Sequence, residues 1–450
     1  IFICCSIGLS FIVLSIFQVI RLFVDPAFLS FGVLASSTST LVGKWSDFGV
    51  FSGMIFLLSF FVITLLKVQR SVKVLTYILL ALSAIMVIIV NSPFIWSAII
   101  IVLLGYGIYH FSIATTKRIS ISILLLIIAS IFFLIKGGDI IKPLSINIQV
   151  DTNELSLPWQ LTLDVASDTI KDKPLFGAGP NRFTNEYLLY KPAIVNSSDF
   201  WGIEFNNSFG FIPTFLVTGG LVGIIAWILF LVFFVRAGVL AIKKEKQGNP
   251  ESFIPISTFF VSAFLIIMAL LYSPSHTILL ITAVFVGLFV SSLPYAEYKH
   301  ISSKKIVTLV LVASLIILAF WTLAYLKKTV SLGYFRSGIN SLSTAKNEKA
   351  LENAELSFKT ALVWDKSDIY YQALAEVVMI GIQSTGQQLL QVAQNNQKQI
   401  DQKSLDILNS LLEKAIGYSR DAIQIDPTNY YNYISEARVS ELALSLQVKN

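Results

Sequence analysis

Apolar residues dominate the first 330 positions and come in runs of 17 to 25 residues, separated by more polar stretches of varied length. About 20 apolar residues cross a bilayer as a helix. The pattern therefore predicts an all-α membrane bundle with nine spans in residues 1–330. The spans are Ile1–Ile20, Phe48–Leu66, Val74–Val90, Ile95–Ile113, Ile119–Ile135, Phe211–Val235, Phe253–Tyr272, Thr277–Leu293 and Ile306–Tyr325.

One polar interval, residues 136–210, is far longer than a connection between two spans requires. Loops longer than about 15 residues are usually functional or disordered. This interval contains aromatic residues, Pro and Gly at definite places, and its pattern predicts a helix that starts near Pro158. We therefore expect a folded loop that is the working part of the protein.

The composition changes sharply after Lys327-Lys328, and residues 331–450 are polar with a helical pattern. Two stretches are similar: each has a small Ala in a helix, an Asp four residues later, and paired aromatics that open the next helix. Their alanines, Ala361 and Ala422, are 61 positions apart, and we interpret Gln383–Lys403 as an insertion or a lengthened helix. The stretch Ala422–Asn429 is similar to a tetratricopeptide repeat turn. Stacked helix pairs usually bind a peptide or a partner protein; the alternative is a plain helical cap.

Composition supports the membrane assignment. Charged residues are 13% and hydrophobic residues 55% of the chain, whereas a soluble domain has about 25% charged residues. The net charge of +6 lies largely at the ends of apolar runs and does not indicate nucleic-acid binding. Under the positive-inside rule, the basic connections are cytoplasmic. The segments Arg21–Asp47, 136–210 and everything after Leu326 are then outside.

Two motifs in and after the long loop are informative together. The first is Ile170-Lys-Asp-Lys-Pro-Leu-Phe-Gly-Ala-Gly-Pro180, which follows Trp159. The second is Phe205-Asn-Asn-Ser208 followed by Thr218-Gly-Gly-Leu-Val-Gly223. At this spacing in a many-span protein, they resemble the O-antigen ligase and polymerase superfamily of bacterial envelope proteins. The segment Thr40–Phe60 weakly resembles the entry segment of that family. Members also often carry a C-terminal repeat domain.

The resemblance implies a glycosyltransferase on the outer face of the bacterial cytoplasmic (inner) membrane. In the family, a glycan on a polyprenyl pyrophosphate is handed to an acceptor hydroxyl of lipid A core, another glycan or a protein. It implies no metal and no cofactor, because pyrophosphate is already a good leaving group. The implied partners are the lipid-linked glycan, membrane lipid, an envelope acceptor and a protein held by the repeats.

Such chemistry needs a base for the acceptor hydroxyl and fixed cations for the departing pyrophosphate. The family His corresponds to Asn206 here, and the family Ser-Arg-Gly segment corresponds to Asn91-Ser-Pro-Phe94, which has no Arg. The Arg that usually precedes Trp159 is also absent. Local substitutes are Glu204 as the base, Arg182 as the cation after the glycine turn, and His276 as a second candidate from another connection.

Four further residues are candidates for substrate binding. Lys191 offers a second cation, Trp201 an aromatic face, and Asn206 and Asn207 amide groups that can bind sugar hydroxyls but cannot take a proton. Each candidate also has a plainer interpretation, as an interfacial cation that binds lipid headgroups or as an exposed loop residue. The sequence leaves these alternatives open.

Other functions are less well supported. Asp164 and Asp168 share a helix face, where a solvated face is favoured over a metal site. The Gly-Ala-Gly-Pro-Asn run does not have the context of a nucleotide loop. A transporter is disfavoured because the spans contain almost no charged residues. The main alternative is a catalytically degenerate lipid-glycan-binding scaffold. Because the chain starts at Ile1 without Met and ends inside a helical repeat, we also expect a fragment.

Overall fold

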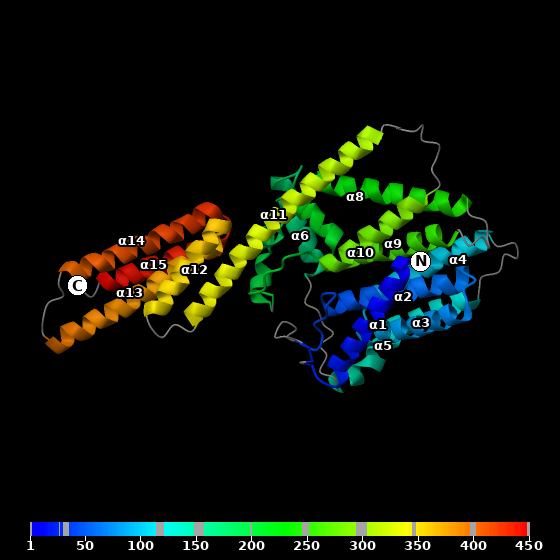
Figure 1. Cartoon of the computed structure of the whole chain (residues 1–450), viewed down its shortest axis with the longest axis horizontal. Coiled ribbons are helices and arrows are strands. Elements are labelled where there is room, and N and C mark those ends of the chain that lie inside the picture. The colour runs from blue at the N-terminus through cyan, green and yellow to red at the C-terminus, as the bar shows by residue number, and fades with distance from the viewer. Residues whose placement is uncertain are drawn as a thin grey trace. The chain divides into compact units, whose positions relative to one another are not determined.

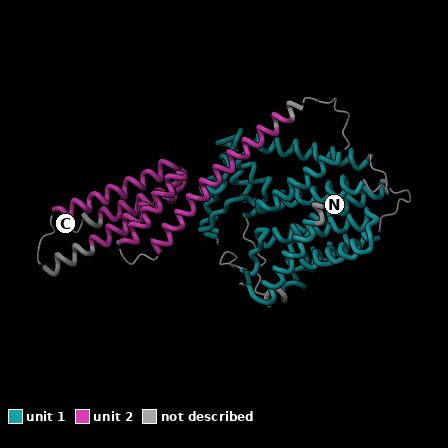
Figure 2. Tube along the Cα trace, viewed as in Figure 1, with its two compact units in different colours: residues 1–296 teal, residues 297–450 magenta. Residues whose placement is uncertain are grey.

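The structure is a computed structural model. It describes residues 2–26, 28–29, 36–113, 121–147, 157–198, 200–244, 252–293, 304–343, 348–396 and 402–447. Every regular element in these ranges is a helix, which confirms the all-α prediction (Figure 1). The chain divides into two compact units, residues 1–296 and 297–450 (Figure 2).

The first unit is a bundle of long apolar helices with a smaller group of short helices. The long helices are α1 (Phe2–Phe23), α2 (Trp45–Leu65), α3 (Arg70–Val90), α4 (Pro93–Ile113), α5 (Ile121–Asn147), α8 (Phe211–Lys244), α9 (Phe253–Leu271) and α10 (His276–Ser292). The short ones are α6 (Trp159–Asp172), α7 (Phe183–Tyr190) and the 3₁₀ helix η1 (Ala193–Ser197).

Eight helices of the described residues are long and apolar enough to span a membrane: α1 to α5, α8, α9 and α11. They coincide with eight of the nine predicted spans. The ninth lies on α10, an apolar helix of 17 residues, which is near the lower limit of length for a span. The chain is therefore a multi-pass helical membrane protein.

Helix α5 differs from the prediction at its end. The loop was expected to start at residue 136, but α5 continues to Asn147, with Pro143 inside it. Gly137 lies against Asn91, the left-handed C-cap of α3, and a Cβ at Gly137 would collide with the Asn91 side chain. A glycine in the helix thus lets α5 continue past the end of α3.

The centre of the bundle is formed by α2 and α9, whose spans are mostly buried, whereas the other spans expose much of their apolar surface. Aromatic side chains fill this core: Phe61 lies 5.8 Å from Phe260 and 5.1 Å from Tyr106, centroid to centroid. An exposed apolar surface of this extent is what a helix in lipid presents. The core thus places the ends of α2 and α9 together.

The second unit consists of α11 (Lys304–Ser343), α12 (Glu348–Trp364), α13 (Asp368–Asn396), α14 (Gln402–Ile425) and α15 (Tyr430–Gln447). The predicted domain boundary after residue 330 falls inside α11, which is one continuous helix. Helix α11 packs on α12, and α13 packs on α14. Both similar stretches turn where their pattern predicts, at Asp365 and at Asp426. Whether they are tetratricopeptide repeats stays a prediction.

Candidate functional site at the loop end of the bundle

The short helices α6, α7 and η1 form a subdomain, residues 157–210, which lies at one end of the bundle. We call this end the loop end. Its small core contains Val165 of α6, Phe183 and Tyr187 of α7, Phe205, and Val217 of α8. Because these side chains are almost fully buried, the long loop is folded, and its core is shared with a membrane helix.

The two motifs of the sequence meet at a break in α8. Residue Gly220 has φ +60° and ψ −157°, so the helix is interrupted there. In an unbroken helix, the N–H groups of Leu221 and Val222 would donate to the carbonyls of Val217 and Thr218. Here they donate instead to the carbonyls of residues 174 and 175, at 3.0 and 3.1 Å. The carbonyls of residues 217 and 218 accept from the N–H groups of residues 178 and 179, at 2.9 and 3.0 Å.

Four backbone hydrogen bonds thus replace two helical ones, and the segment 174–179 is inserted into the break. We call this contact, between residues 174–179 and 217–222, the glycine junction. Gly177 has φ +62°, and a Cβ there would collide with the carbonyl of Val217. A Cβ at Gly220 would lie 2.5 Å from the Gly177 nitrogen. The two glycines are required because neither backbone leaves room for a side chain.

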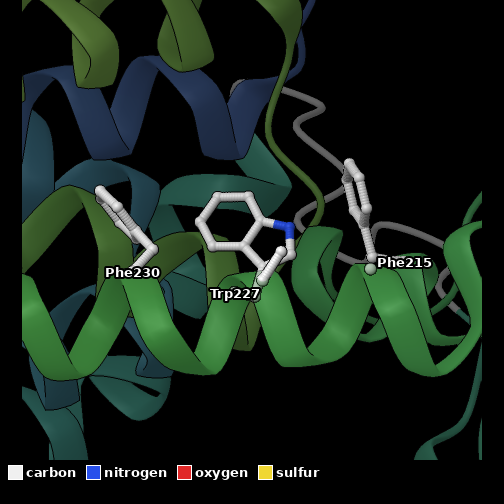
Figure 3. A pocket seen from close by; sticks show the side chains of 5 residues that line it. Phe215, Trp227 and Phe230 are labelled. Carbon is white, nitrogen blue, oxygen red and sulfur yellow. The ribbon is translucent and has the colours of Figure 1, made fainter.

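The break also folds the first part of α8 back along its second part. Phe215 and Trp227 are 12 positions apart, about 18 Å along a straight helix, yet their ring centroids are 5.8 Å apart (Figure 3). Phe211 is 16 positions from Trp227, and these centroids are 6.0 Å apart. An aromatic row therefore starts at the loop end and continues along α8 through Phe230, whose ring lies 5.5 Å from that of Trp227.

A second junction at the loop end is built around a buried carboxylate, Asp47, in the first turn of α2. Its Oδ1 accepts hydrogen bonds from the Tyr272 hydroxyl at 2.5 Å and from the Ser275 N–H at 2.8 Å. Its Oδ2 accepts from the Lys44 N–H at 2.7 Å. We call this group the carboxylate junction. It ties the start of α2 to the link between α9 and α10, which supports the placement of His276 at the loop end.

The two junctions are connected through the end of the long loop. The Phe211 N–H donates to the Tyr272 carbonyl at 3.2 Å, and a Cβ at Gly210 would collide with the Leu270 carbonyl. Buried Ser208 is held to Thr214, whose hydroxyl lies 3.0 Å from that of Ser208. The loop end thus combines the subdomain, the start of α8, the link before α10 and the start of α2.

The candidate site residues lie around this region and mostly on its surface. Arg182 is the N-cap of α7 and follows directly on the turn at Gly179. Glu204 is exposed, and both residues have interaction partners within the structure. His276 is exposed as the first residue of α10.

The proposed sugar-binding residues belong to the subdomain. Thr184 donates a hydrogen bond to Asn206 Oδ1 at 2.9 Å, so the residue at the family His position is fixed against α7. Asn207 is exposed. Lys191 donates to the Trp201 carbonyl at 3.1 Å, and the Trp201 side chain is 69% exposed. The structure thus groups Lys191 with Trp201 and Asn206 with α7, whereas His276 comes from a separate connection.

Sequence reasoning missed a charged cluster where α6 ends against α7. The Lys173 ammonium lies 2.7 Å from a carboxylate oxygen of buried Glu186, and the Tyr190 hydroxyl donates to Asp172. This hydrogen bond, with a smaller effect of burial, raises the pKa of Tyr190 to about 12. Glu186 and Tyr190 are four residues apart on α7, and this spacing predicts that they share a helix face. The sequence does not indicate that their partners are residues 172 and 173 at the end of α6. The cluster fixes the base of the glycine junction.

The acidic pair on α6 is partly engaged in the same region. Asp168 accepts a hydrogen bond from Lys171 at 2.7 Å, one turn along the helix. This contact lies on an exposed face, as the plainer interpretation of the pair expects.

These features define a class: a multi-pass helical membrane protein with a folded subdomain docked into a broken membrane helix. No protein-family model matches the chain, and a search of curated proteins finds no relative.

Proposed function

We propose that the protein is an O-antigen-ligase-like glycosyltransferase. It moves a glycan from a polyprenyl-pyrophosphate carrier to an acceptor hydroxyl, on the outer side of the bacterial cytoplasmic membrane. The single observation that carries this proposal is the glycine junction. The two motifs on which the resemblance depends, 43 positions apart at Gly177 and Gly220, bind each other through backbone groups. A chance match of two unrelated motifs gives no reason for such a contact.

In the proposed reaction, the acceptor oxygen attacks the anomeric carbon of the glycan. The bond between that carbon and the pyrophosphate oxygen breaks, and polyprenyl pyrophosphate leaves with the electron pair. The acceptor proton passes to a base. Glu204 is our first candidate, because it is an exposed carboxylate on the loop subdomain, and His276 is the second. Arg182 stabilises the negative charge that develops on the leaving group, since a guanidinium can bind phosphate oxygens with two parallel hydrogen bonds.

The remaining candidates bind the sugar. Trp201 presents an exposed indole, and Lys191 is held beside it by the Trp201 carbonyl. Asn206 and Asn207 offer amide groups on the same subdomain. The second unit, residues 297–450, is proposed to bind a protein partner of the envelope.

The test is transfer in proteoliposomes. The full chain receives a radiolabelled polyprenyl-pyrophosphate glycan and an envelope extract as acceptor, with a chelator present. We expect label in the acceptor, and a loss of at least 100-fold in Arg182→Ala and in whichever of Glu204→Ala and His276→Ala removes the base. Lys171→Ala, an exposed cation on α6, is the matched control and should keep full transfer.

The second candidate function is a scaffold that binds the lipid-linked glycan without transferring it. The observation that favours it is the hydrogen bond of Asn206 to Thr184, because it places an amide, which cannot accept a proton, where the family has its His. Transfer gained only in Asn206→His would identify a site that has lost its base. Retained lipid binding with no transfer in either protein would favour the scaffold.

A further inference from the structure

Helix α11 joins a membrane span to the helices of the second unit without a break. It is one continuous helix from Lys304 to Ser343, and its apolar stretch, Ile306–Tyr325, has the length of about 20 residues that crosses a bilayer. Lys327 and Lys328 follow directly, and lysines at the end of a span place their ammonium groups at the bilayer surface. Each residue after them lies at most about 1.5 Å further from that surface.

The first contacts of α11 with α12 place the end of α12 at the height of this lysine pair. The Ser331 hydroxyl donates to the Ala361 carbonyl at 2.8 Å, and the ring centroids of Phe335 and Phe358 are 5.5 Å apart. Residue numbers rise on one helix as they fall on the other, so the two helices are antiparallel. Trp364, three residues after Ala361, is therefore level with the lysine pair, where the span ends.

The turns between the helices of the second unit gather at this same end (Figure 1). The Asn429 side-chain amide donates to the Asp368 carboxylate at 2.7 Å, and that of Asn432 donates to the same oxygen at 3.2 Å. These bonds hold the turn before α15 beside the start of α13. The ends of α12 and α14 and the starts of α13 and α15 thus meet, and we call this region, residues 363–369 and 425–431, the turn end.

Exposed apolar side chains from each of these four helices cover the turn end. They are Val363 and Trp364 of α12, Ile369 of α13, Ile425 of α14, and Tyr430 and Tyr431 of α15. The two tyrosine rings stack on each other, with centroids 4.2 Å apart. An exposed patch of apolar residues marks an interaction site, and Trp and Tyr are the residues enriched where a membrane meets water.

The charges at the turn end suit an anionic surface. The exposed cations include Lys327, Lys328 and Lys366. The carboxylates of Asp365, Asp368 and Asp426 are only partly exposed. Two of them accept hydrogen bonds from the turns themselves, Asp368 from Asn429 and Asp426 from the Thr428 hydroxyl at 2.6 Å. The lysines therefore present the more accessible charges, beside the aromatic rings.

We propose that the turn end is a membrane-docking surface. Trp364, Tyr430 and Tyr431 insert among the headgroups of the bilayer that α11 spans, and the lysines bind lipid phosphates. The occupant is lipid because α11 itself brings the patch to the height of the headgroups. Docking fixes the tilt of the second unit on the bilayer and leaves its other faces open to a partner. The proposal is independent of glycan transfer.

The first test is depth-dependent fluorescence quenching of the full chain in vesicles of phosphatidylcholine and phosphatidylglycerol. Cys4→Ala and Cys5→Ala leave one labelling site, and Val363→Cys carries a bimane fluorophore. Leu444→Cys is the matched control, because it is exposed and lies 13 residues, about 20 Å, along α15 from Tyr431. The lipids carry a nitroxide on the headgroup or on acyl carbon 5. We expect both nitroxides to quench bimane at residue 363 at least threefold more than at residue 444.

Two other results would overturn the proposal. Quenching at residue 363 by the headgroup nitroxide but not by the acyl nitroxide would show that the turn end is near the bilayer without inserting. Shielding of this label from both nitroxides and from aqueous iodide would show that protein, either a partner or a second copy of the chain, covers the patch.

Variants test the apolar anchor. Ile369→Ser, with bimane at residue 363, should lower quenching by the acyl nitroxide at least twofold, because less apolar surface leaves water. Ile407→Ser on α14 is the matched control, since Ile407 is 50% exposed and Ile369 49%, and it should quench as the wild type does. If Ile369→Ser lowers the unfolding temperature, Tyr431→Ser replaces it. Equal quenching in the turn-end variant and in Ile407→Ser would contradict insertion.

A further variant tests the cations. Phosphatidylglycerol should strengthen acyl quenching of the wild type relative to pure phosphatidylcholine, because anionic lipids attract basic residues at the surface. The double variant Lys327→Gln, Lys328→Gln should lose at least half of this increase. The same increase in the variant and in the wild type would contradict the assignment of phosphate binding to these lysines.

Discussion

The glycine junction and the carboxylate junction hold the same end of the bundle, and they do so by opposite means. At the glycine junction, two backbones bind through four hydrogen bonds, and the contact requires that Gly177 and Gly220 have no side chain. At the carboxylate junction, one side chain, that of Asp47, accepts hydrogen bonds from three donors on two segments. The first depends on shape and the second on a single acceptor.

The difference decides which substitutions each junction can tolerate. No residue other than glycine fits the first, because a positive φ and a backbone neighbour both exclude a Cβ. The second can be repaired in part by any side chain that still offers an oxygen in the right place. Substitutions at the two junctions should therefore differ in how much they lower the free energy of unfolding, and in whether a conservative variant restores it.

The largest expected effect is from Gly220→Ala. The conformation of Gly220, with φ +60° and ψ −157°, is essentially confined to glycine and costs another residue about 1–3 kcal/mol. Forcing a methyl group against the Gly177 backbone costs about 1–3 kcal/mol more. We expect the free energy of unfolding to fall by about 2–6 kcal/mol, measured by denaturant titration in detergent micelles. Gly177→Ala should behave in the same way.

The matched control is Gly202→Ala in the same subdomain, where nothing lies within 4 Å of an added Cβ. It should change stability by less than about 0.5 kcal/mol. If Gly220→Ala were as mild as this control, the glycine junction would not be a rigid contact.

A smaller effect is expected from Asp47→Ala. It leaves three donors without their acceptor in a buried site, and a hydrogen bond to a charged group contributes about 1.5–3 kcal/mol. We expect a loss of about 2–3 kcal/mol in the same titration. Asp47→Asn should recover part of it, because the amide oxygen can still accept from Tyr272 and Ser275. Equal losses in both variants would show that shape, and not the acceptor, matters here too.

The hydrophobic pattern was enough to predict most of the bundle. Apolar runs as long as those of α2 and α9 have one stable solution in a membrane, a helix that satisfies its own backbone. The turns at Asp365 and Asp426 were also predictable, because each Asp follows a small Ala by four residues in a helical pattern. These alanines, Ala361 and Ala422, are both fully buried. The start of α6 after Pro158 was also correct.

The junctions could be predicted only in part. Gly-rich motifs indicate places where two backbones can approach closely, but they do not identify the second segment. The insertion of residues 174–179 into α8 is a tertiary contact, which a local sequence pattern does not specify. Asp47 and Tyr272 are 225 positions apart, so no local pattern pairs them. The extension of α5 beyond residue 136 was missed because the apolar run ends at Ile135, whereas the helix continues to Asn147 with Gly137 packed closely against Asn91.

A pH titration tests the cluster that supports the glycine junction. The pKa of Tyr190 is raised to about 12, chiefly by its hydrogen bond to Asp172, against an ordinary value near 10. The bond needs the neutral phenol. Its contribution to stability is therefore complete below pH 10 and is lost as the pH rises through 12. Difference absorbance of tyrosinate between the wild type and Tyr190→Phe should show this late titration, and Asp172→Asn should return it toward 10. A Tyr190 that titrates near 10 in the wild type would contradict the contact.

The smallest effect on stability is expected from Lys171→Ala, two positions before Lys173, which forms the ion pair with buried Glu186. The comparison of the two lysines shows how the exposure of an ion pair changes its contribution to stability. The Lys171–Asp168 pair is exposed on both sides, 70% and 43%, whereas the Glu186 side chain that pairs with Lys173 is 5% exposed. Exposed pairs contribute about 0–1 kcal/mol, but removal of one partner of a buried carboxylate leaves its charge uncompensated. Lys171→Ala should change the free energy of unfolding by less than about 0.5 kcal/mol, and Lys173→Ala should lower it several times more in the same titration. If the two losses were equal, Glu186 would be hydrated in solution, and the base of the glycine junction would be held by its backbone bonds alone.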